Sequence, residues 1–263
     1  MKKIFNYLLI LTLIIFTSCS SDDDGTSLPP IDQDYVPLAI EFTDFENPET
    51  NISISYDSNG RLSQLFGERS GGTEEYNLNY TGEQLTSLVQ IRNLGLGTIT
   101  DTFVFSYNSE GILTSIEAPG DFGTKDIPVI YNALENSYSF TFDFETKIVD
   151  LNENNVLESF QILNSNLNLN FDSTQAGVFD NVDIPVGLLL LILSDNDFNF
   201  STNFLHPLQI SSISVEGAVF TGNLVYTNSR DDNNNLSFIN ISGVIGSQTV
   251  SSELNITYQL KDN

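Results

Sequence analysis

The chain has 263 residues, a formal net charge of −26 and a single cysteine. A surface this acidic repels phosphate backbones and anionic headgroups, so we expect neither nucleic-acid binding nor electrostatic docking on a membrane. With one histidine, His206, and one cysteine, the chain excludes a transition-metal site built from several imidazoles or thiolates.

The first residues form an export signal. Two lysines precede an apolar stretch at residues 4–16, which is shorter than the about 20 apolar residues of a transmembrane helix. The sequence Phe-Thr-Ser-Cys at residues 16–19 resembles a lipobox, whose first position is typically Leu. The resemblance implies a signal peptide at residues 1–18 and lipidation of Cys19, which also explains an unpaired cysteine in an exported protein. The alternative is an ordinary cleavage site followed by a stray thiol.

A polar and acidic run follows the cysteine: Ser20, Ser21, Asp22, Asp23 and Asp24. This run resembles the tether of surface-exposed lipoproteins of Bacteroidota, and the resemblance implies a surface-export signal. The alternative is that the aspartates only solvate a linker. Prolines follow, so we expect residues 19–38 to form an extended tether on a lipid-anchored protein of the outer membrane, exposed at the cell surface.

Residues 39–263 read as a single all-β domain. Short runs rich in Ile, Val, Phe, Tyr and Thr alternate with clusters of Asn, Asp, Gly and Ser, which is typical of antiparallel β-structure. One unit repeats at residues 54–65, 78–88 and 105–116, and weaker copies open at residues 129 and 151. The anchor positions 56, 80, 107, 131 and 151 are separated by 24, 27, 24 and 20 residues. Each unit therefore holds two short strands and two turns.

The turn of each unit indicates a β-hairpin. Asp57 opens a four-residue turn that closes on Gly60, which suits a type I turn with glycine in the left-handed conformation. Leu62 and Leu65, on the strand that follows, are three residues apart, and strict alternation cannot place both on one face. We therefore expect a β-bulge or a locally two-sided strand there.

These motifs resemble the degenerate YD repeats of RHS-like proteins, over residues 50–260. The resemblance implies a curled antiparallel sheet of successive β-hairpin repeats and implies no catalytic residues. A β-sandwich and a partly open barrel are the alternatives. The apolar run at residues 184–193 breaks the repeat pattern. We interpret it as a buried strand or a short helix in the core, which could plug a curled sheet; the alternative is a groove for lipid or a partner.

Two kinds of candidate binding residue stand out. The richest acidic spots, which contain Asp195, Asp197, Asp231 and Asp232, suit calcium but lack the spacing of an EF-hand loop, so turn residues are the alternative. No other cofactor is expected. The recurring tyrosines could form a binding ladder for a sugar or could be structural anchors near the turns, which is the reading we favour. They are Tyr56, Tyr80, Tyr107 and Tyr131.

No nucleophile elbow of the Gly-x-Ser-x-Gly type occurs, and we interpret His206 as a turn residue. We therefore predict a non-enzymatic surface lipoprotein whose β-repeat domain is a binding or structural module for a glycan or an envelope partner. The alternative is a glycoside hydrolase-like enzyme that uses a carboxylate pair, because 35 acidic side chains always offer some pair at a suitable separation. A purely structural envelope component is a third hypothesis.

Overall fold

The computed structural model describes residues 34–44, 50–69, 71–93, 95, 97–120, 123–142, 145–162, 165–194, 206–217 and 221–261. The predicted lipidation and export residues, Cys19 and residues 20–24, lie outside these ranges, as do Asp195 and Asp197. In the described part, no helix is long and apolar enough to cross a membrane.

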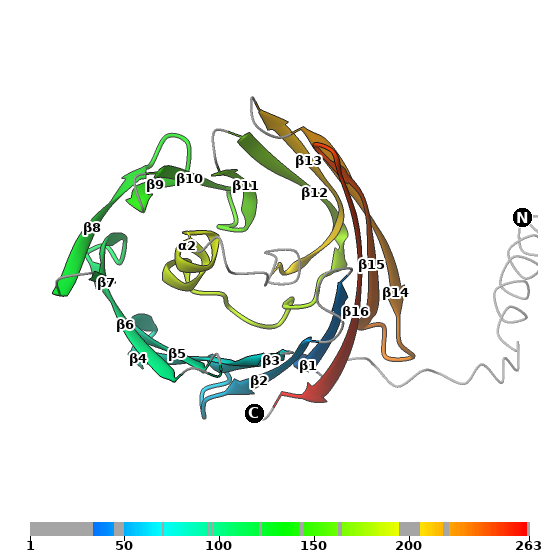
Figure 1. Ribbon diagram of the computed structural model, residues 1–263, viewed down its shortest axis with the longest axis horizontal. Coiled ribbons are helices and arrows are strands. Elements are labelled where there is room, and N and C mark those ends of the chain that lie inside the picture. Colours follow the sequence, from blue (N-terminus) through cyan, green and yellow to red (C-terminus); the bar gives the residue numbers. More distant parts are fainter. Residues whose placement is uncertain are drawn as a thin grey trace, which may run out of the picture. The chain divides into compact units, whose positions relative to one another are not determined.

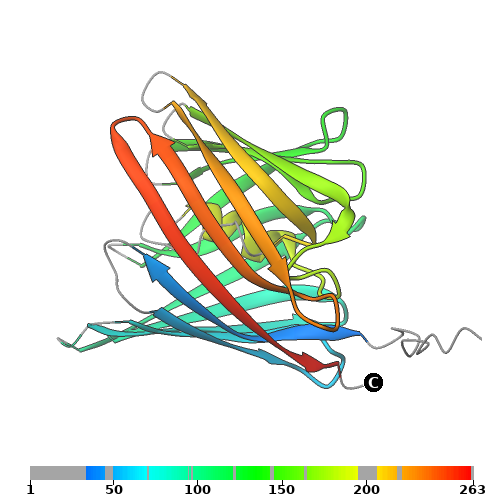
Figure 2. The ribbon, with the colours of Figure 1, turned by 90° about the vertical axis from the view of Figure 1, so that its right-hand side faces the viewer.

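The described strands form one closed antiparallel barrel (Figures 1 and 2). Each strand pairs with its neighbours in the sequence, and β1 closes the barrel on β16, with Ile40 opposite Ile256. The predicted all-β antiparallel fold is confirmed, and its sheet curls until it closes. Its first strand begins at Tyr35, four residues before the predicted start of the domain. The strands are β1 Tyr35–Asp44, β2 Thr50–Tyr56, β3 Leu62–Arg69, β4 Gly72–Thr81, β5 Gln84–Asn93, β6 Thr98–Tyr107, β7 Leu113–Gly120, β8 Gly123–Asn132, β9 Ser137–Phe142, β10 Glu145–Leu151, β11 Leu157–Ile162, β12 Ser165–Ala176, β13 Leu208–Gly217, β14 Gly222–Arg230, β15 Leu236–Ile245 and β16 Gln248–Leu260.

The predicted turn chemistry is present in the hairpins. The side chain of Asp57 accepts hydrogen bonds from the backbone N–H groups of Asn59 (2.9 Å) and Arg61 (3.0 Å). The same pattern recurs in three further turns, which open with Asn108, Asn152 and Asp231. Each turn closes on a residue with positive φ, namely Gly60, Gly111, Asn155 or Asn234. The turn that opens at Asp231 has this hairpin geometry too, with Arg230 rather than a tyrosine before it.

The predicted β-bulge is confirmed. Tyr56 pairs with Leu62 while its neighbour Ser55 pairs with Gln64, so Ser63 is an extra residue. The bulge shifts the alternation by one residue, and Leu62 and Leu65 are both buried as a result. The corresponding extra residues in the other units are Thr86, Thr114, Glu158 and Ser237. The copy at Tyr131 pairs without a bulge.

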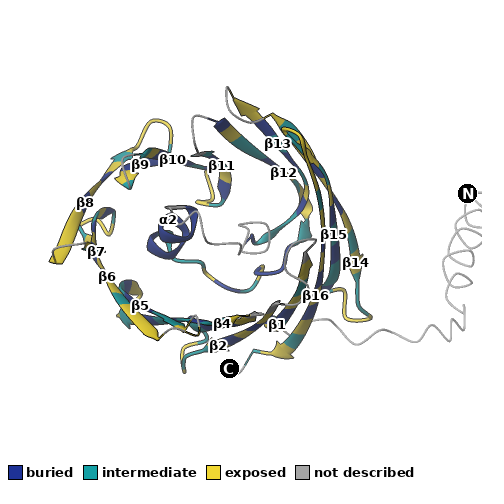
Figure 3. Ribbon diagram, in the orientation of Figure 1, coloured by how far each residue is buried: buried dark blue, intermediate teal, exposed yellow. Residues whose placement is uncertain are grey.

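The barrel is apolar inside and polar outside. In β16 the inward side chains of Leu254 and Ile256 are at most 5% exposed. The outward residues of the same strand are all exposed and polar: Thr249, Ser251, Glu253, Asn255, Thr257 and Gln259. Figure 3 shows the same alternation of buried and exposed residues around the wall. The hydrophobic effect therefore draws the strands around a common interior.

The helix α2, Val186–Ser194, lies inside this barrel (Figure 1). Its leucines and isoleucine are buried on every face, and Leu188 and Leu190 are fully buried. At Gly187 the helix approaches the wall so closely that a Cβ atom would lie 2.8 Å from the Phe105 ring. The predicted core position of this apolar run is confirmed, and of the two forms expected, a buried strand or a short helix, the structure shows the helix. The helix therefore occupies part of the barrel interior, where it packs beside β5 and β7.

The buried interior also holds a few polar side chains. Lys147 is only 2% exposed, and its ammonium lies 2.6 Å from the carboxylate of Glu145. On β4 and β5, Tyr76 and Gln90 both donate hydrogen bonds to the buried carboxylate of Glu74, at 2.5 and 2.8 Å. Buried charge is tolerated where it is paired in this way.

Candidate functional site

At one end of the barrel, the strands of several hairpins separate. We call this the connection end, because β12 ends there and β13 begins there, joined through α2. In β3 and β4 the pairing runs from Arg69 and Gly72, at the opposite end, and stops at Gln64 and Asn77. Beyond that point the two strands diverge. We call each such divergence a seam.

Tyrosine hydroxyls bridge four of these seams. Each tyrosine near the end of one strand donates a hydrogen bond to a backbone carbonyl of the preceding strand, beyond the point where the pairing of the two strands stops. The bonds run from Tyr56 to Pro37 (2.7 Å), Tyr80 to Leu62 (2.9 Å), Tyr107 to Leu85 (2.8 Å) and Tyr258 to Leu236 (3.0 Å). Burial raises the pKa of the Tyr107 phenol to about 12. The hydroxyls therefore remain protonated donors, and we call these side chains clamps.

The clamp has the same position relative to the strand register in all four tyrosine seams. In β3 and β4 the last pair is Gln64 and Asn77. The clamp joins Leu62, two residues before Gln64, to Tyr80, three residues after Asn77. In β7 and β8 the same offsets give Leu113 and Tyr131, but the Tyr131 hydroxyl donates to Asn136 instead. The last pair of β11 and β12 is Ser159 and Asn168, so the same offsets give Leu157 and Phe171.

In β13 and β14 the last pair is Ser212 and Val225, and the offsets give Ile210 and Asn228. The side chain of Asn228 donates to the Ile210 carbonyl at 2.9 Å. The tyrosine is thus replaced on both sides of the β12–β13 pair, which carries the connection through α2.

His206 takes over the missing bond at the seam between β11 and β12. Phe171 has no hydroxyl, and Nε2 of His206 lies 3.0 Å from the Leu157 carbonyl oxygen instead. Nδ1 lies 2.8 Å from the Leu208 carbonyl oxygen and 3.1 Å from the Leu208 backbone nitrogen. In the tautomer with the proton on Nε2, the ring donates to Leu157 and Nδ1 accepts the Leu208 N–H. The imidazole is 2% exposed and its centroid lies 5.1 Å from that of Phe171. Burial lowers the pKa of His206, which favours this neutral form.

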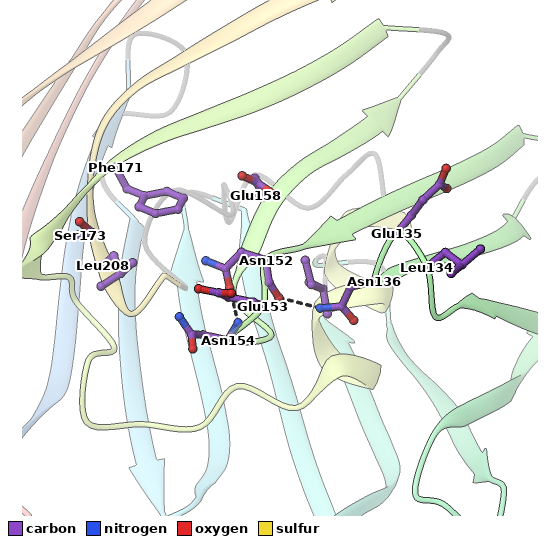
Figure 4. Close-up of a pocket in the computed structure, with 11 residues that line it drawn as sticks. Leu134, Glu135, Asn136, Asn152, Glu153, Asn154, Glu158, Phe171, Ser173 and Leu208 are labelled. Carbon is purple, nitrogen blue, oxygen red and sulfur yellow. Dashed lines mark hydrogen bonds between the residues drawn. The ribbon is translucent and has the colours of Figure 1, made fainter.

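The seam between β11 and β12 opens into a groove of about 690 Å³ (Figure 4). Two hairpin turns, at residues 134–136 and 152–154, form one side, and Phe171, Ser173 and Leu208 form the other. A second hollow of about 690 Å³ continues over the outer face of β10–β12 and shares Glu135 and Glu158 with the first. We call the two hollows together the seam groove.

The seam groove is lined by amides, carboxylates and a few apolar groups. Asn136 donates to the backbone carbonyl of Asn152 at 2.6 Å, which ties the two turns together (Figure 4). Ser159 donates to the carboxylate of Asp150 at 2.5 Å. The lining includes no lysine or arginine. Such a surface offers many hydrogen-bond acceptors and disfavours an anionic ligand.

Most of the predicted binding residues form hydrogen bonds that hold strands or turns together. Tyr56, Tyr80 and Tyr107 occupy three different seams, and Tyr131 donates to Asn136 within its own hairpin at 2.8 Å. The side chain of Asp231 caps its own turn, and Asp232 is exposed. Within the described ranges, no group of three or more His, Cys, Asp or Glu side chains could hold a metal ion.

The sequence analysis missed three residues of the seam: Phe171, His206 and Glu158. Glu158 is the extra residue of the bulge in its unit, and Phe171 interrupts the series of tyrosines. That interruption is the signal that could have identified the seam, but it becomes visible only once the register of β11 and β12 is known.

No protein-family model and no curated protein matches the sequence. Among solved structures, the chain is similar to a porin-like protein from Bacteroides uniformis, with 14% identity and a TM-score of 0.38; the match covers 85% of this chain and 96% of that one. It is also similar to a porin-like protein from Bacteroides vulgatus, with 11% identity and a TM-score of 0.41, over 86% and 99% of the two chains. At these values neither likeness bears on function, and the barrel described above rests on its own strand pairing.

Proposed function

We propose that this chain is a non-enzymatic binding module, anchored in the outer membrane through Cys19, whose barrel stands in water outside the bilayer. The observation that carries the proposal is the polarity of the wall. A barrel that spans a membrane presents an apolar band to the lipid on every strand. Here the outward side chains are predominantly polar, and the exposed large apolar residues are scattered: Leu38, Ile99, Val104, Ile130, Leu134, Val225, Val244 and Leu260.

The apolar interior supports a binding role rather than a channel role. The helix α2 and the inward side chains of the strands are buried together in one apolar core. A pore would need a polar, water-filled lumen. A ligand is therefore expected on the wall or at the connection end, where the seam groove is the hollow that we propose as its site.

The chemistry of the seam groove favours a neutral ligand with many hydroxyl groups, such as a glycan. Amide and carboxylate side chains accept and donate hydrogen bonds to hydroxyls, and the Phe171 ring offers an apolar face. Glu135, Glu153 and Glu158 are all exposed. A glycosidase acid is usually held protonated by apolar surroundings, so exposed carboxylates favour binding over catalysis.

The anchor and the position of the barrel have a direct test. Detergent phase separation should send the wild-type protein to the detergent phase and the Cys19→Ala protein to the aqueous phase, with the β-sheet circular dichroism signal retained. Cys19→Ala protein that remains in the detergent phase, or that loses its fold in water, would contradict a barrel that stands outside the bilayer.

The ligand class has a separate test. Thermal shift against a panel of neutral oligosaccharides, calcium and a chelator should give a saturable shift with one neutral oligosaccharide and no turnover. Glu158→Gln and Phe171→Ala should weaken that binding at least about tenfold, as expected for groups that contact a ligand. Glu253→Gln, on the exposed face of β16, is the matched control and should leave affinity unchanged. Turnover that disappears with a single carboxylate substitution would favour the hydrolase instead.

A further inference from the structure

We infer that His206 is a positioning residue that clamps the β11–β12 seam in place of a tyrosine hydroxyl, and that it couples the width of the seam groove to the seating of α2. The inference deepens the proposed function, because it describes how that same groove is regulated. Its structural part, the clamp, does not depend on any ligand.

The clamp follows from the register of the strands. Leu157 and Phe171 hold the positions that Leu62 and Tyr80 hold in β3 and β4. Phe171 has no hydroxyl to donate to the Leu157 carbonyl, and a buried backbone acceptor that loses a hydrogen bond is costly. Nε2 of His206 satisfies it at 3.0 Å, and the imidazole packs on the Phe171 ring. In the tyrosine seams one side chain supplies both the aromatic ring and the hydrogen-bond donor. In the seam of β11 and β12, Phe171 supplies the ring and His206 supplies the donor.

The donor also belongs to a different segment from the ring. In the tyrosine seams the clamp is part of the strand that it holds. His206 instead lies in the connection between β12 and β13, whose two legs are bonded to each other: Gly177 N–H donates to the Pro207 carbonyl at 2.8 Å, and Phe179 N–H to the His206 carbonyl at 3.4 Å. A Cβ atom at residue 177 would lie 2.4 Å from the His206 carbonyl oxygen, so the legs cannot tolerate a side chain there.

The first leg leads directly into the buried helix. Val182 N–H donates to the Phe179 carbonyl at 3.1 Å, and Leu189 N–H donates to the Pro185 carbonyl at 3.1 Å where α2 begins. A ligand that shifts Phe171, a lining residue of the groove, therefore disturbs the His206 ring and, through the legs, the seat of α2. Coupling of this kind needs an element with two arrangements that both sites bias. In this proposal the two arrangements are the His206 clamp with its bond to Leu157 formed and the same clamp with that bond broken.

Hydrogen exchange on four full-length variants tests the clamp and the coupling separately. His206→Ala should speed exchange about tenfold or more at the amides of residues 157–160, and also at Val182 and Leu189, because both sides lose the bond. His206→Ala with Phe171→Tyr should restore protection at residues 157–160, since the new hydroxyl can reach Leu157. Val182 and Leu189 should stay fast in this double variant. Phe171→Tyr alone measures the effect of the added hydroxyl beside His206.

Tyr80→Phe is the matched control. It removes the clamp hydroxyl in the seam of β3 and β4 and should speed exchange near Leu62 without affecting Val182 or Leu189. If His206→Ala does not fold but the double variant does, the rescue itself supports the clamp; if neither folds, a hydroxyl cannot replace His206 and the clamp is overturned.

Two other outcomes also decide the inference. Unchanged exchange at residues 157–160 in His206→Ala would overturn the clamp. Recovery of Val182 and Leu189 together with the seam in the double variant would overturn the coupling. If the exchange pattern is as expected but no neutral oligosaccharide binds the wild-type protein, the proposed function fails while the clamp stands.

Discussion

The hydroxyl of Tyr80 donates a hydrogen bond of 2.9 Å to the carbonyl oxygen of Leu62, across two strands whose pairing has already ended. Tyr80→Phe leaves this carbonyl without its partner, and we expect it to lower the free energy of unfolding by about 1 kcal/mol. Urea denaturation measures the loss. Tyr131→Phe is the comparison, because that hydroxyl bonds only to Asn136 in its own hairpin. An equal or larger loss for Tyr131→Phe would contradict a special role for the seams.

The packing of α2 inside the barrel predicts a large effect of truncation. Leu190 is fully buried, and Leu190→Ala should cost about 2–5 kcal/mol because the surroundings cannot collapse into the cavity. Leu134, which is 98% exposed in a turn, is the control, and Leu134→Ala should change stability by less than about 0.5 kcal/mol. Similar losses for the two variants in urea denaturation would place α2 outside the core.

The ion pair between the buried Lys147 and the partly exposed Glu145 predicts opposite effects of two substitutions. Lys147→Met removes a charge that is costly to bury and keeps the packing volume, so stability should be unchanged or rise by about 1–4 kcal/mol. Glu145→Gln leaves the ammonium without its counter-charge and should cost about 3–5 kcal/mol. Thermal and urea denaturation of both variants decide the sign. A loss with Lys147→Met larger than that with Glu145→Gln would contradict this account.

The buried imidazole predicts a dependence of stability on pH. Burial keeps the pKa of His206 below its ordinary value of 6.5, so the unfolded chain binds a proton at a higher pH than the folded chain does. The neutral imidazole therefore contributes fully to the free energy of unfolding above pH 6.5. This contribution falls by up to about 1.4 kcal/mol per pH unit as the pH drops below 6.5, until the pKa of the folded state is reached. Urea denaturation between about pH 7 and 5 should show this slope, and His206→Gln should remove it. A slope that persists in the variant would come from other groups.

The turns predict a contrast between two substitutions at equivalent positions. Gly111 has a φ of 80°, and Gly111→Ala should cost about 1–2 kcal/mol because a Cβ atom is disfavoured in this conformation. Asn155 has a φ of 59° in the corresponding turn, so Asn155→Gly should be neutral or slightly stabilising. Denaturation of both variants is the measurement. A loss in Asn155→Gly as large as that in Gly111→Ala would mean that side-chain contacts, rather than backbone conformation, dominate at this position.

The sequence by itself determined the local structure of the repeat. An aspartate or asparagine followed three residues later by glycine or asparagine specifies the turn, because capping and positive φ involve only neighbouring residues. The spacing of Leu62 and Leu65 likewise indicated a bulge or a locally two-sided strand, since side-chain alternation in a strand has a period of two residues, and the register decided for the bulge. The apolar run around α2 could be assigned to the core for the same kind of reason, from its composition and length.

Only the tertiary structure decided that the sheet closes and which residues form the seam groove. Closure joins β1 to β16, and the twist and shear that bring these distant strands together accumulate over the whole sheet, so no local pattern encodes them. The role of Phe171 depends on the register of β11 and β12, and that of His206 on a contact with Leu157, 49 residues away. The sequence indicated only a turn residue at His206, whereas the structure places its imidazole beside the Leu157 carbonyl. A hydrogen bond depends on distance in space and not on separation along the chain, so the sequence could not reveal this contact.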